Sequence, residues 1–321
     1  MRTVLWLLVW LGVSALLTLL AARLFAHDRA WALVVANGFT ELIYAPAWLA
    51  AALALATRRW ALLAASGVLC AWHGLQVIPL FLPKHPPAAC GADLVLFSAN
   101  LYAGNPRQAE LIEEIAASDA DVLALQEFTP AWGEALSDAD FARGYRHREE
   151  HAEKRPTGSA IWSRERLVEH GTFELEGYVQ TRARVKVGGG LVDLWNVHPL
   201  PPISPDLLPR HRAMMEALLE RVEQLDRPFI LTGDFNSSGH SAYASRLRVI
   251  SEDAWELAGV GFGFTWPNSG RKAPPMRIDH VWISPELTVR SISVGLGAGS
   301  DHRPLRVVLA PRAGGRLAEG C

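Results

Sequence analysis

Acidic side chains are nearly absent from the first 89 residues of this 321-residue chain. Of its 33 Asp and Glu residues, only Asp28 and Glu41 lie in that region. Only six of its 31 Lys and Arg residues lie there as well. So little charge over so long a stretch excludes the surface of an ordinary soluble domain. We therefore interpret this region as a membrane anchor.

The rest of the chain lacks an excess of basic residues. From Cys90 onward it carries 25 basic and 31 acidic side chains, a net charge of −6. Nucleic-acid-binding proteins usually carry a basic face, so this balance argues against long polyanions as partners, although it leaves room for a local basic stripe. No internal repeat or low-complexity tract is present, and the length suits about two domains.

Three apolar runs fill the N-terminal region, at residues 4–22, 31–56 and 60–82. Each approaches the length of about 20 residues that spans the hydrocarbon of a bilayer. Several of the tryptophans here sit near the ends of the runs, as interfacial aromatics do. A cleaved signal peptide is the alternative for the first run, but two more runs follow and no clear small-residue cleavage site is visible. We predict about three transmembrane helices.

Basic residues indicate how the anchor is oriented. On the side of the N-terminus stand Arg2, Arg58 and Arg59, and on the other side Arg23, Arg29 and Lys84, offset by Asp28. With the terminal amine, the first side is slightly more basic, and such sides are usually cytoplasmic. We therefore predict an integral membrane protein, in the bacterial inner membrane, whose C-terminal part faces away from the cytoplasm.

Two ionisable residues, Glu41 and His73, lie inside the apolar runs. Such groups are costly in lipid and usually turn inward to a partner. Their distances from the turn near Arg58 put them within about one helical turn of the same depth. We expect them to pair, as contacts between helices rather than as a functional site.

A proline-rich stretch separates the anchor from a globular part. We divide the chain into an anchor (1–83), a linker (84–91), a catalytic domain (92–310) and a tail (311–321). Short apolar runs predict strands at 94–99, 121–125, 159–163, 181–187, 191–197, 229–232, 277–283 and 305–309. Helical spacing of apolar residues predicts helices at 106–117 and 207–224. The pattern predicts an α/β sandwich of mixed sheets with covering helices.

Polar residues stand at the predicted strand ends. They are Asn100, Glu127, His198, Asp234, Asn236, Asp279, Asp301 and His302. Each alone has an ordinary structural explanation, such as a turn. Eight of them at successive strand ends are hard to obtain by chance. Acids, amides and imidazoles held on a rigid sheet are suited to bind a metal ion and a phosphate.

The order and context of these residues resemble the endonuclease/exonuclease/phosphatase superfamily, which is deoxyribonuclease I-like. The matching segments are Ser98-Ala99-Asn100, Leu125-Gln126-Glu127, Asn196-Val197-His198, Gly233-Asp234-Phe235-Asn236, Arg277-Ile278-Asp279-His280 and Ser300-Asp301-His302. The resemblance covers about residues 92–310 and implies a four-layer αββα sandwich with its site at one edge. A membrane-anchored subgroup with three N-terminal spans also fits, since the segment 198–202 is similar to its histidine segment.

The resemblance also implies roles for the polar residues. Glu127 is implied as the principal ligand of Mg²⁺, with Asn100 and Asp301 in the same shell and Mn²⁺ as an alternative. Asp234 would orient or deprotonate the attacking water, and Asn236 would hold a phosphate oxygen. His198 would donate to a non-bridging oxygen. His302 would contact the phosphate or act as a base, oriented by Asp279. The reaction is in-line attack of water on phosphorus.

The substrate is less defined. Tyr102 occupies a place where some nucleases of the superfamily carry an acid, which puts a second acidic ligand there in doubt. Trp266, Arg182 and Arg212 are candidate substrate-binding residues. The first hypothesis is hydrolysis of a phosphoester at or near the membrane surface, lipid-linked in one version, because the anchor raises its effective concentration. The alternatives are a membrane-anchored nuclease and an inactive, membrane-tethered binding module. No protein partner is predicted.

The three cysteines are Cys70, Cys90 and Cys321. In the sheets that the resemblance implies, the first and last strands lie together, so a Cys90–Cys321 disulfide is conceivable in an oxidising compartment. Two unrelated free thiols are the alternative, and we favour them.

Overall fold

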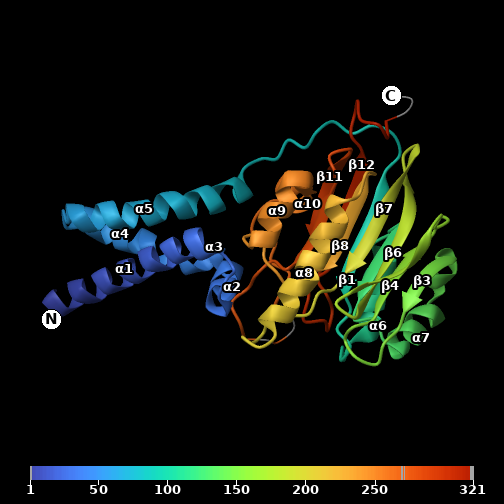
Figure 1. The fold of residues 1–321 in the computed structure, drawn as a ribbon, viewed down its shortest axis with the longest axis horizontal. Helices are drawn as coiled ribbons and strands as arrows, with labels where there is room; N and C mark the ends of the chain where they lie inside the picture. Colours follow the sequence, from blue (N-terminus) through green and yellow to red (C-terminus); the bar gives the residue numbers. More distant parts are fainter. Residues whose placement is uncertain (1, 269, 271, 319–321) are drawn as a thin grey trace.

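A helical anchor and a globular α/β domain make up the computed structural model of this protein, which describes residues 2–268, 270 and 272–318. Figure 1 shows the anchor extending to one side of the domain, with the N-terminus at its far end. The linker after the anchor runs along the domain and leads into its first strand (Figure 1).

The anchor consists of short and long helices. They are α1 (Arg2–Ala26), α2 (Trp31–Gly38), α3 (Thr40–Ile43), α4 (Pro46–Ala56), α5 (Trp60–Val77) and the 3₁₀ helix η1 (Ile78–Phe81). Two stretches, Thr3–Ala26 and Trp60–Phe81, are long and apolar enough to cross a membrane. The bent pair Trp31–Gly38 and Thr40–Ala56 is a third candidate only if it counts as one span.

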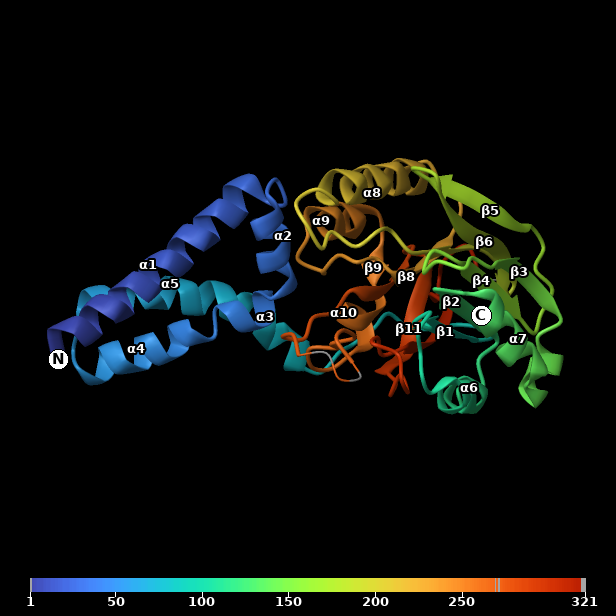
Figure 2. The ribbon, with the colours of Figure 1, turned by 90° about the horizontal axis from the view of Figure 1, so that it is seen from below.

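The second apolar run is therefore not one straight helix. It bends by 76° between α2 and the helices that follow. Gly38 ends α2, and glycine weakens a helix because it gives up more backbone freedom on folding than other residues do. Side-chain oxygens of Asn37 and Thr40, on either side of the bend, accept hydrogen bonds from Arg23 of α1 at 2.6 and 2.5 Å. Figure 2 shows α2 lying between the long helices and the globular domain.

The expected pairing of Glu41 with His73 takes a different form. The His73 ring contacts the backbone oxygen of Glu41 at 3.1 Å and accepts from the indole of Trp48 at 2.9 Å. The carboxylate of Glu41 instead pairs with His240 of the globular domain at 2.9 Å. The prediction of a side-chain pair within the anchor was wrong, because the bend carries Glu41 toward the domain.

Two sheets of six strands form the globular domain. In order across the first sheet the strands are β11 (Leu287–Val294), β12 (Leu305–Pro311), β1 (Leu94–Asn100), β2 (Val122–Gln126), β4 (Ser159–Ser163) and β3 (His147–His151). Across the second they are β5 (His170–Leu175), β6 (Tyr178–Val187), β7 (Gly190–Val197), β8 (Phe229–Asp234), β10 (Asp279–Ile283) and β9 (Glu252–Asp253). In each sheet one central pair is parallel, β1 with β2 and β7 with β8, and the other pairs are antiparallel.

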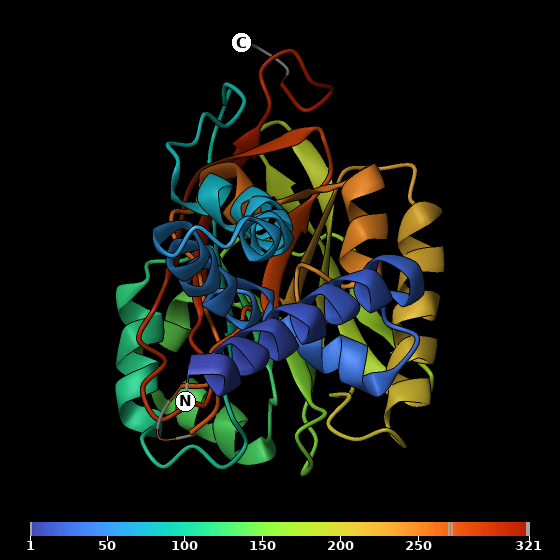
Figure 3. The ribbon, with the colours of Figure 1, turned by 90° about the vertical axis from the view of Figure 1, so that its left-hand side faces the viewer.

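Helices cover the outer faces of both sheets. They are α6 (Gln108–Ala117), α7 (Pro130–Asp138) and the 3₁₀ helix η2 (Asp140–Gly144) on the first sheet, and α8 (Leu208–Glu223) and α9 (Ala242–Ile250) on the second. The short helix α10 (Ala254–Ala258) packs at one edge. One apolar cluster lies between the sheets, and one lies under each helical layer. Figure 3 shows the two helical layers on opposite sides of the strands, so the expected sandwich of mixed sheets is confirmed.

Several strands have no counterpart among the predicted ones. The edge strand β3 reads His-Arg-Glu-Glu-His, with no apolar residue to indicate burial. The strand β11 alternates between buried and exposed positions over only part of its length. Edge strands are hydrogen-bonded on one side only and need little apolar sequence. The apolar runs in the sequence therefore did not indicate β3 and β11.

Candidate active site

The candidate site lies where the ends of five strands meet at one edge of the two sheets. Asn100 ends β1 in register with Gln126, which ends β2, so Glu127 follows directly beside it. In the second sheet, Val197 at the end of β7 is in register with Gly233 of β8. His198 and Asp234 are therefore brought to the same edge.

Three of the predicted residues lie at or before the start of a strand rather than after its end. Asp279 is the first residue of β10, and Asp301 and His302 lie in the loop before β12. Asp279 therefore does stand at a strand end, at its beginning, whereas the prediction was wrong for Asp301 and His302, which lie in a loop. All three still reach the site, because β10 runs antiparallel to β8 and Asp279 is in register with Asp234.

An amide and two carboxylates from both sheets form the centre of the site. The side-chain nitrogen of Asn100 donates to Glu127 at 3.2 Å and to Asp234 at 3.1 Å. The second oxygen of Glu127 accepts from the backbone nitrogen of Ala103 at 2.8 Å. Asn100 is itself fixed, because its oxygen accepts from the backbone nitrogen of Tyr102 at 3.0 Å. Asn100 thus joins Glu127 of one sheet to Asp234 of the other.

Two imidazoles flank Asp234. The Nε2 atoms of His198 and His302 lie 3.4 and 3.5 Å from its Oδ2 atom. Burial alone would raise the pKa of Asp234, but the charge of His302 and the hydrogen bond and charge of His198 lower it to about 2. Asp234 is 1% exposed. A buried carboxylate that stays ionised beside two imidazoles is a negative centre enclosed by donors.

His302 is held between two carboxylates. Its Nδ1 atom lies 2.9 Å from the Oδ2 atom of Asp279. Burial alone would lower the pKa of His302, but the charges of Asp279 and Asp234 raise it to about 10. The hydrogen bond to Asp279 fixes the ring orientation and leaves Nε2 on the side of Asp234.

His198 is placed by the strand next to its own. Its backbone nitrogen donates to the side-chain oxygen of Gln180 at 2.6 Å. Burial alone would lower the pKa of His198, but the hydrogen bond with Asp234 and the charge of Asp234 raise it. Among the described residues, its buried Nδ1 atom has no hydrogen-bond partner. The nitrogen that the ring presents to the site is Nε2, which lies 3.4 Å from Asp234.

Asn236 closes the site on the side of the second sheet. Its side-chain nitrogen donates to the backbone oxygen of Pro199 at 2.9 Å, and its backbone nitrogen donates to Asp234 at 2.9 Å. Its φ of 49° lies in the left-handed region, where Asn is one of the more tolerant residues. This tight turn returns the amide of Asn236 toward Asp234.

The donor set fits a divalent metal ion. The carboxylates of Glu127, Asp234 and Asp279 offer hard oxygen ligands of the kind that Mg²⁺ prefers. One group close enough to share an ion is Asp234, Asp279 and His302. Asp279 and His302 of this group also bond to each other, at 2.9 Å. Asp301 is also near, since its charge acts on the pKa of His302.

The three candidate substrate-binding residues lie in different places. Trp266 lies in a loop bonded to the site, because the backbone nitrogen of Asn268 donates to the backbone oxygen of Asp301 at 2.7 Å. Arg182 is exposed on β6, in register with Trp195, which packs under the helices of the second sheet. Arg212 donates to the backbone oxygen of Asp28 in the anchor. Neither Arg182 nor Arg212 lies beside the central residues of the site.

Two buried side-chain amides, those of Gln126 and Asn196, support the site from the space between the sheets. Both lie in the matching segments of the sequence, but the sequence predicts no role for them. The side-chain nitrogen of Gln126 donates to Asn196 at 2.6 Å, across the space between the sheets. Asn196 in turn donates to Ser159 and to the backbone oxygen of Leu125. Because Glu127 and His198 follow within two residues of these amides, the bonds fix the spacing of the site. Their only signal in the sequence is a polar residue inside an apolar strand.

Gly233 permits the close approach of the two central strands. At this position a Cβ atom would meet the backbone oxygen of Val197 at 2.1 Å, and the φ is +134°. Any side chain there would push β7 and β8 apart next to Asp234. Glycine is therefore required by the space available beside the site.

Comparisons with known proteins agree with this fold. A statistical profile of the Endonuclease/Exonuclease/phosphatase family matches residues 97–302, which leaves the anchor unmatched. An endonuclease/exonuclease/phosphatase from Bacteroides vulgatus is similar in structure, with a TM-score of 0.58 and 18% identity over 68% of this chain and 99% of that one.

Structures of TDP2 are also similar. TDP2 from C. elegans has a TM-score of 0.59 and 18% identity over 69% of this chain and 76% of that one. D. rerio TDP2 complexed with single-strand DNA product has a TM-score of 0.57 and 20% identity over 68% of this chain and 99% of that one. No curated protein matches the chain. The chain belongs to the endonuclease/exonuclease/phosphatase family, whose members are phosphoester hydrolases and generally use a divalent metal ion.

Proposed function

We propose that this protein is a Mg²⁺-dependent hydrolase that cleaves a phosphoester at or near the membrane surface by in-line attack of water. The family supports phosphoester hydrolysis, and the ionised Asp234 between two imidazoles supports a working site. Glu127, Asn100 and Asp301 would hold the ion, with Mn²⁺ as a substitute. The ion would supply positive charge to the phosphate oxygens.

Asp234 orients the attacking water. Its carboxylate is fixed by Asn100 and by the backbone of Asn236, at 3.1 and 2.9 Å. A carboxylate held this firmly can accept a hydrogen bond from water and keep it in line with the phosphorus atom. These bonds favour orientation of the water over its full deprotonation before attack, because they stabilise the ionised form of the carboxylate.

Three side chains then face the phosphate. His198 and Asn236 donate to non-bridging oxygens, where negative charge develops. His302 contacts the phosphate and stabilises the same charge, since its bond to Asp279 holds the ring with Nε2 facing the reacting group. The charges of Asp279 and Asp234 raise the pKa of His302 to about 10, so the ring is protonated at neutral pH and its Nε2 atom acts as a donor.

The observation that carries the membrane part of the proposal is the contact of the catalytic loops with α2. The indole nitrogen of Trp31 donates to the backbone oxygen of Pro202 at 2.8 Å, four residues after His198. The hydroxyl of Ser238 donates to the backbone oxygen of Asn37 at 3.0 Å, two residues after Asn236. Both catalytic loops are thus bonded to the helix between the apolar spans and the domain. This supports a substrate presented by the bilayer.

The orientation of the anchor is part of the same proposal. We place the catalytic domain on the side away from the cytoplasm, in the bacterial inner membrane. Cys90 is disulfide-bonded and Cys70 is free, whereas Cys321 lies outside the described residues. Our preference for free thiols was therefore wrong for Cys90. Disulfides persist in oxidising compartments, which supports this orientation.

A membrane-anchored nuclease is the second candidate function. The similarity to D. rerio TDP2, solved with single-strand DNA product, favours it. The net charge of −6 from Cys90 onward disfavours it. The third hypothesis, an inactive binding module, has no observation in its favour.

The test is a panel of substrates with the full-length protein in detergent. Phospholipid, sphingomyelin and lipid-linked phosphates are set against single- and double-stranded DNA, with Mg²⁺ or with a chelator. Asp234→Asn is the catalytic variant, and Asp226→Asn, at a side chain 91% exposed on the surface, is its matched control. We expect turnover of a lipid phosphoester that is lost with chelator and in Asp234→Asn only. Cleavage of DNA without lipid turnover would contradict the proposal.

A further inference from the structure

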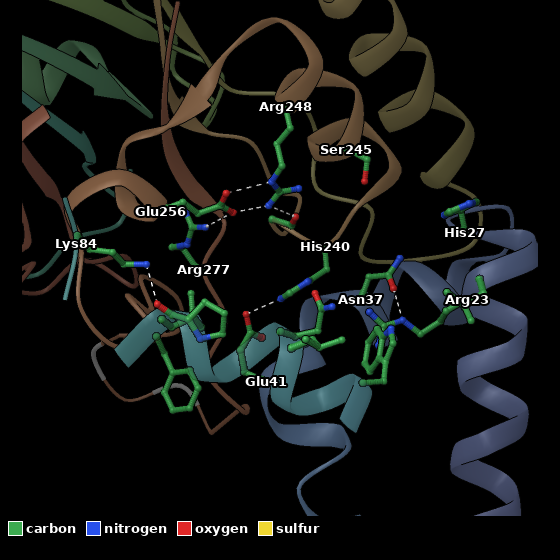
Figure 4. A pocket seen from close by; sticks show the side chains of 18 residues that line it. Arg23, His27, Asn37, Glu41, Lys84, His240, Ser245, Arg248, Glu256 and Arg277 are labelled. Atoms are coloured by element: carbon green, nitrogen blue, oxygen red, sulfur yellow. Dashed lines mark hydrogen bonds and ion pairs between the residues drawn. The ribbon is translucent and has the colours of Figure 1, made fainter. Parts of the chain in front are cut away.

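A second polar cavity, of about 580 Å³, lies at the junction of the anchor and the catalytic domain. We call it the junction pocket. Its wall on the anchor side comes from the domain-facing ends of α1 and α5, and its other wall comes from α9, α10 and the loop around Arg277. Figure 4 shows Glu41, His240, Arg248 and Arg277 around it. None of the eight candidate site residues lines it, so it is a separate cavity.

Positive charge predominates in the junction pocket. Four arginine and lysine side chains line it, against two carboxylates: Arg23, Lys84, Arg248 and Arg277, and Glu41 and Glu256. Glu256 pairs with Arg248 at 2.5 Å, and Glu41 pairs with His240 at 2.9 Å. Arg277 pairs with Asp253 at 2.7 Å, so Arg23 and Lys84 are the lining cations without a carboxylate partner among the described residues. Lys84 donates only to the backbone oxygen of Pro79, at 2.8 Å, among the described contacts. Its other N–H groups remain for a ligand.

The environment of Arg23 is a separate indication that the junction pocket binds an anion. Its side chain is buried, with 6% exposed, and its hydrogen-bond partners Asn37 and Thr40 are neutral. Among the described residues, its buried Nη1 atom has no hydrogen-bond partner. A buried guanidinium without a carboxylate is costly unless an anion compensates it. The rings of Tyr44 and Trp72, at 5.5 and 5.0 Å from its guanidinium carbon, offset only part of that cost.

The junction pocket also has an apolar wall, along which the apolar part of a ligand would lie. Leu24 of α1 and Leu75 of α5 both line it and are 55% and 73% exposed. These leucines belong to the two stretches that are apolar enough to cross a membrane. A phosphate in the pocket would therefore have acyl chains beside it, along the outer faces of α1 and α5.

We propose that the junction pocket binds the headgroup of an anionic phospholipid, with its phosphate at Lys84, Arg23 and Arg248 and its acyl chains along Leu24 and Leu75. The lipid is bound and not cleaved there, because the pocket lacks the catalytic residues. It would fix the angle between anchor and domain by bridging α1, α9 and the linker. This assignment does not depend on the substrate of the active site.

The experiment is native mass spectrometry of the full-length protein released from detergent. The probes are phosphatidylglycerol and phosphatidylcholine of identical acyl chains, with glycerol 1-phosphate as the soluble headgroup. Lys84→Ala and Arg248→Ala remove cations from the pocket. Arg246→Ala is the matched control, since Arg246 lies on the same helix but pairs with Glu216 and Glu223 outside the pocket.

We expect one phosphatidylglycerol to be retained in preference to phosphatidylcholine. Each pocket variant should weaken this retention by about fivefold, the effect of one cation near a lipid surface, and Arg246→Ala should leave it unchanged. Equal retention of the two lipids, or undiminished retention by Lys84→Ala, would overturn the proposal. Saturation of the same site by glycerol 1-phosphate at the concentration of the lipid would assign a soluble phosphate and would overturn it as well.

Discussion

A few hydrogen bonds decide what each side chain of the active site can do. Asn100 contacts both Glu127 and Asp234 and so joins the carboxylate that we propose as a metal ligand to the one that we propose to orient the water. Asp279 bonds to the Nδ1 atom of His302 and leaves its Nε2 atom on the side of Asp234. The chemistry of the site depends on these fixed orientations more than on the residue types alone.

Glu127 provides a test of the metal assignment. In Glu127→Gln, one carboxylate charge is lost while the shape and the bond from Ala103 remain. We expect the Mg²⁺ concentration for half-maximal activity to rise about tenfold or more, because charge and ligand basicity determine the affinity for the ion. Activity titrated against Mg²⁺ measures this. An unchanged half-maximal concentration would show that the ion is held elsewhere, for example by Asp234, Asp279 and His302.

At this scale the sequence allowed much of the site to be predicted. All eight polar residues chosen from the strand pattern lie at one edge of the sandwich. For five of them the reason is that apolar runs reveal where buried strands stop, whereas Asp279, Asp301 and His302 lie at or before the start of a strand. Arg182 and Arg212 could not be placed in the same way. Their positions depend on which face of β6 points outward and on how the anchor docks onto α8, and neither is encoded in local sequence.

At the scale of elements, one buried cluster holds β10 in place behind the site. Asp253, at the end of β9, accepts from Arg277 at 2.7 Å and lies 3.1 Å from the Nδ1 atom of His280. The other nitrogen of His280 contacts the backbone oxygen of Ser237 at 3.0 Å, next to Asn236. The segment from Arg277 to His280 therefore supports the catalytic loop as well as supplying Asp279.

The cluster predicts a pH dependence of stability. Burial alone would raise the pKa of Asp253, but Arg277 and His280 hold it well below its ordinary value of 3.8. A carboxyl whose folded pKa is lowered contributes stability above its unfolded pKa and loses it as the pH falls toward the folded value. At pH 7, Asp253→Asn should lower the melting temperature on the order of 10 °C, because Arg277 is left unpaired.

Melting curves of the wild type and Asp253→Asn between pH 7 and about pH 3 would measure this dependence. The difference in melting temperature should shrink once the pH falls below 3.8, where the unfolded chain binds the proton. A difference that stays constant over the whole range would contradict the assignment of an ionised Asp253.

The junction of anchor and domain makes a second prediction at this scale. Glu41 and His240 form a pair whose side chains are 11% and 18% exposed. A thermodynamic cycle of Glu41→Ala, His240→Ala and the double variant should give a coupling on the order of 1 kcal/mol, because the two residues contact each other directly. Thermal unfolding of the full chain in detergent measures it. Additive effects of the two substitutions would show that the contact does not stabilise the junction.

The fold of the elements was predictable only where strands are buried. The central strands of both sheets appear in the sequence as apolar runs, and the two helices with clear spacing appear as α6 and α8. The polar edge strand β3 and the 76° bend after α2 leave no such apolar pattern in the sequence. The bend depends on contacts of Asn37 and Thr40 with Arg23, which only the assembled anchor provides.

On the scale of the whole molecule, the anchor and the catalytic domain form a continuous structure. Bonds from Trp31, Asn37 and Glu41 tie the anchor to two loops of the domain, the one between β7 and α8 and the one between β8 and α9. The active site therefore has a set position relative to the apolar helices. The central claim is that this arrangement directs hydrolysis to phosphoesters within the bilayer that holds the protein.

Surface dilution tests that claim most directly. Full-length protein is placed in vesicles with the phosphoester lipid that it hydrolyses, which is then diluted with an inert lipid at constant bulk concentration. The account predicts that the Mg²⁺-dependent rate falls in proportion to the mole fraction of substrate in the bilayer, with no turnover by Asp234→Asn at any fraction. A rate that follows bulk concentration alone, or equal turnover of a soluble short-chain phosphoester, would contradict it.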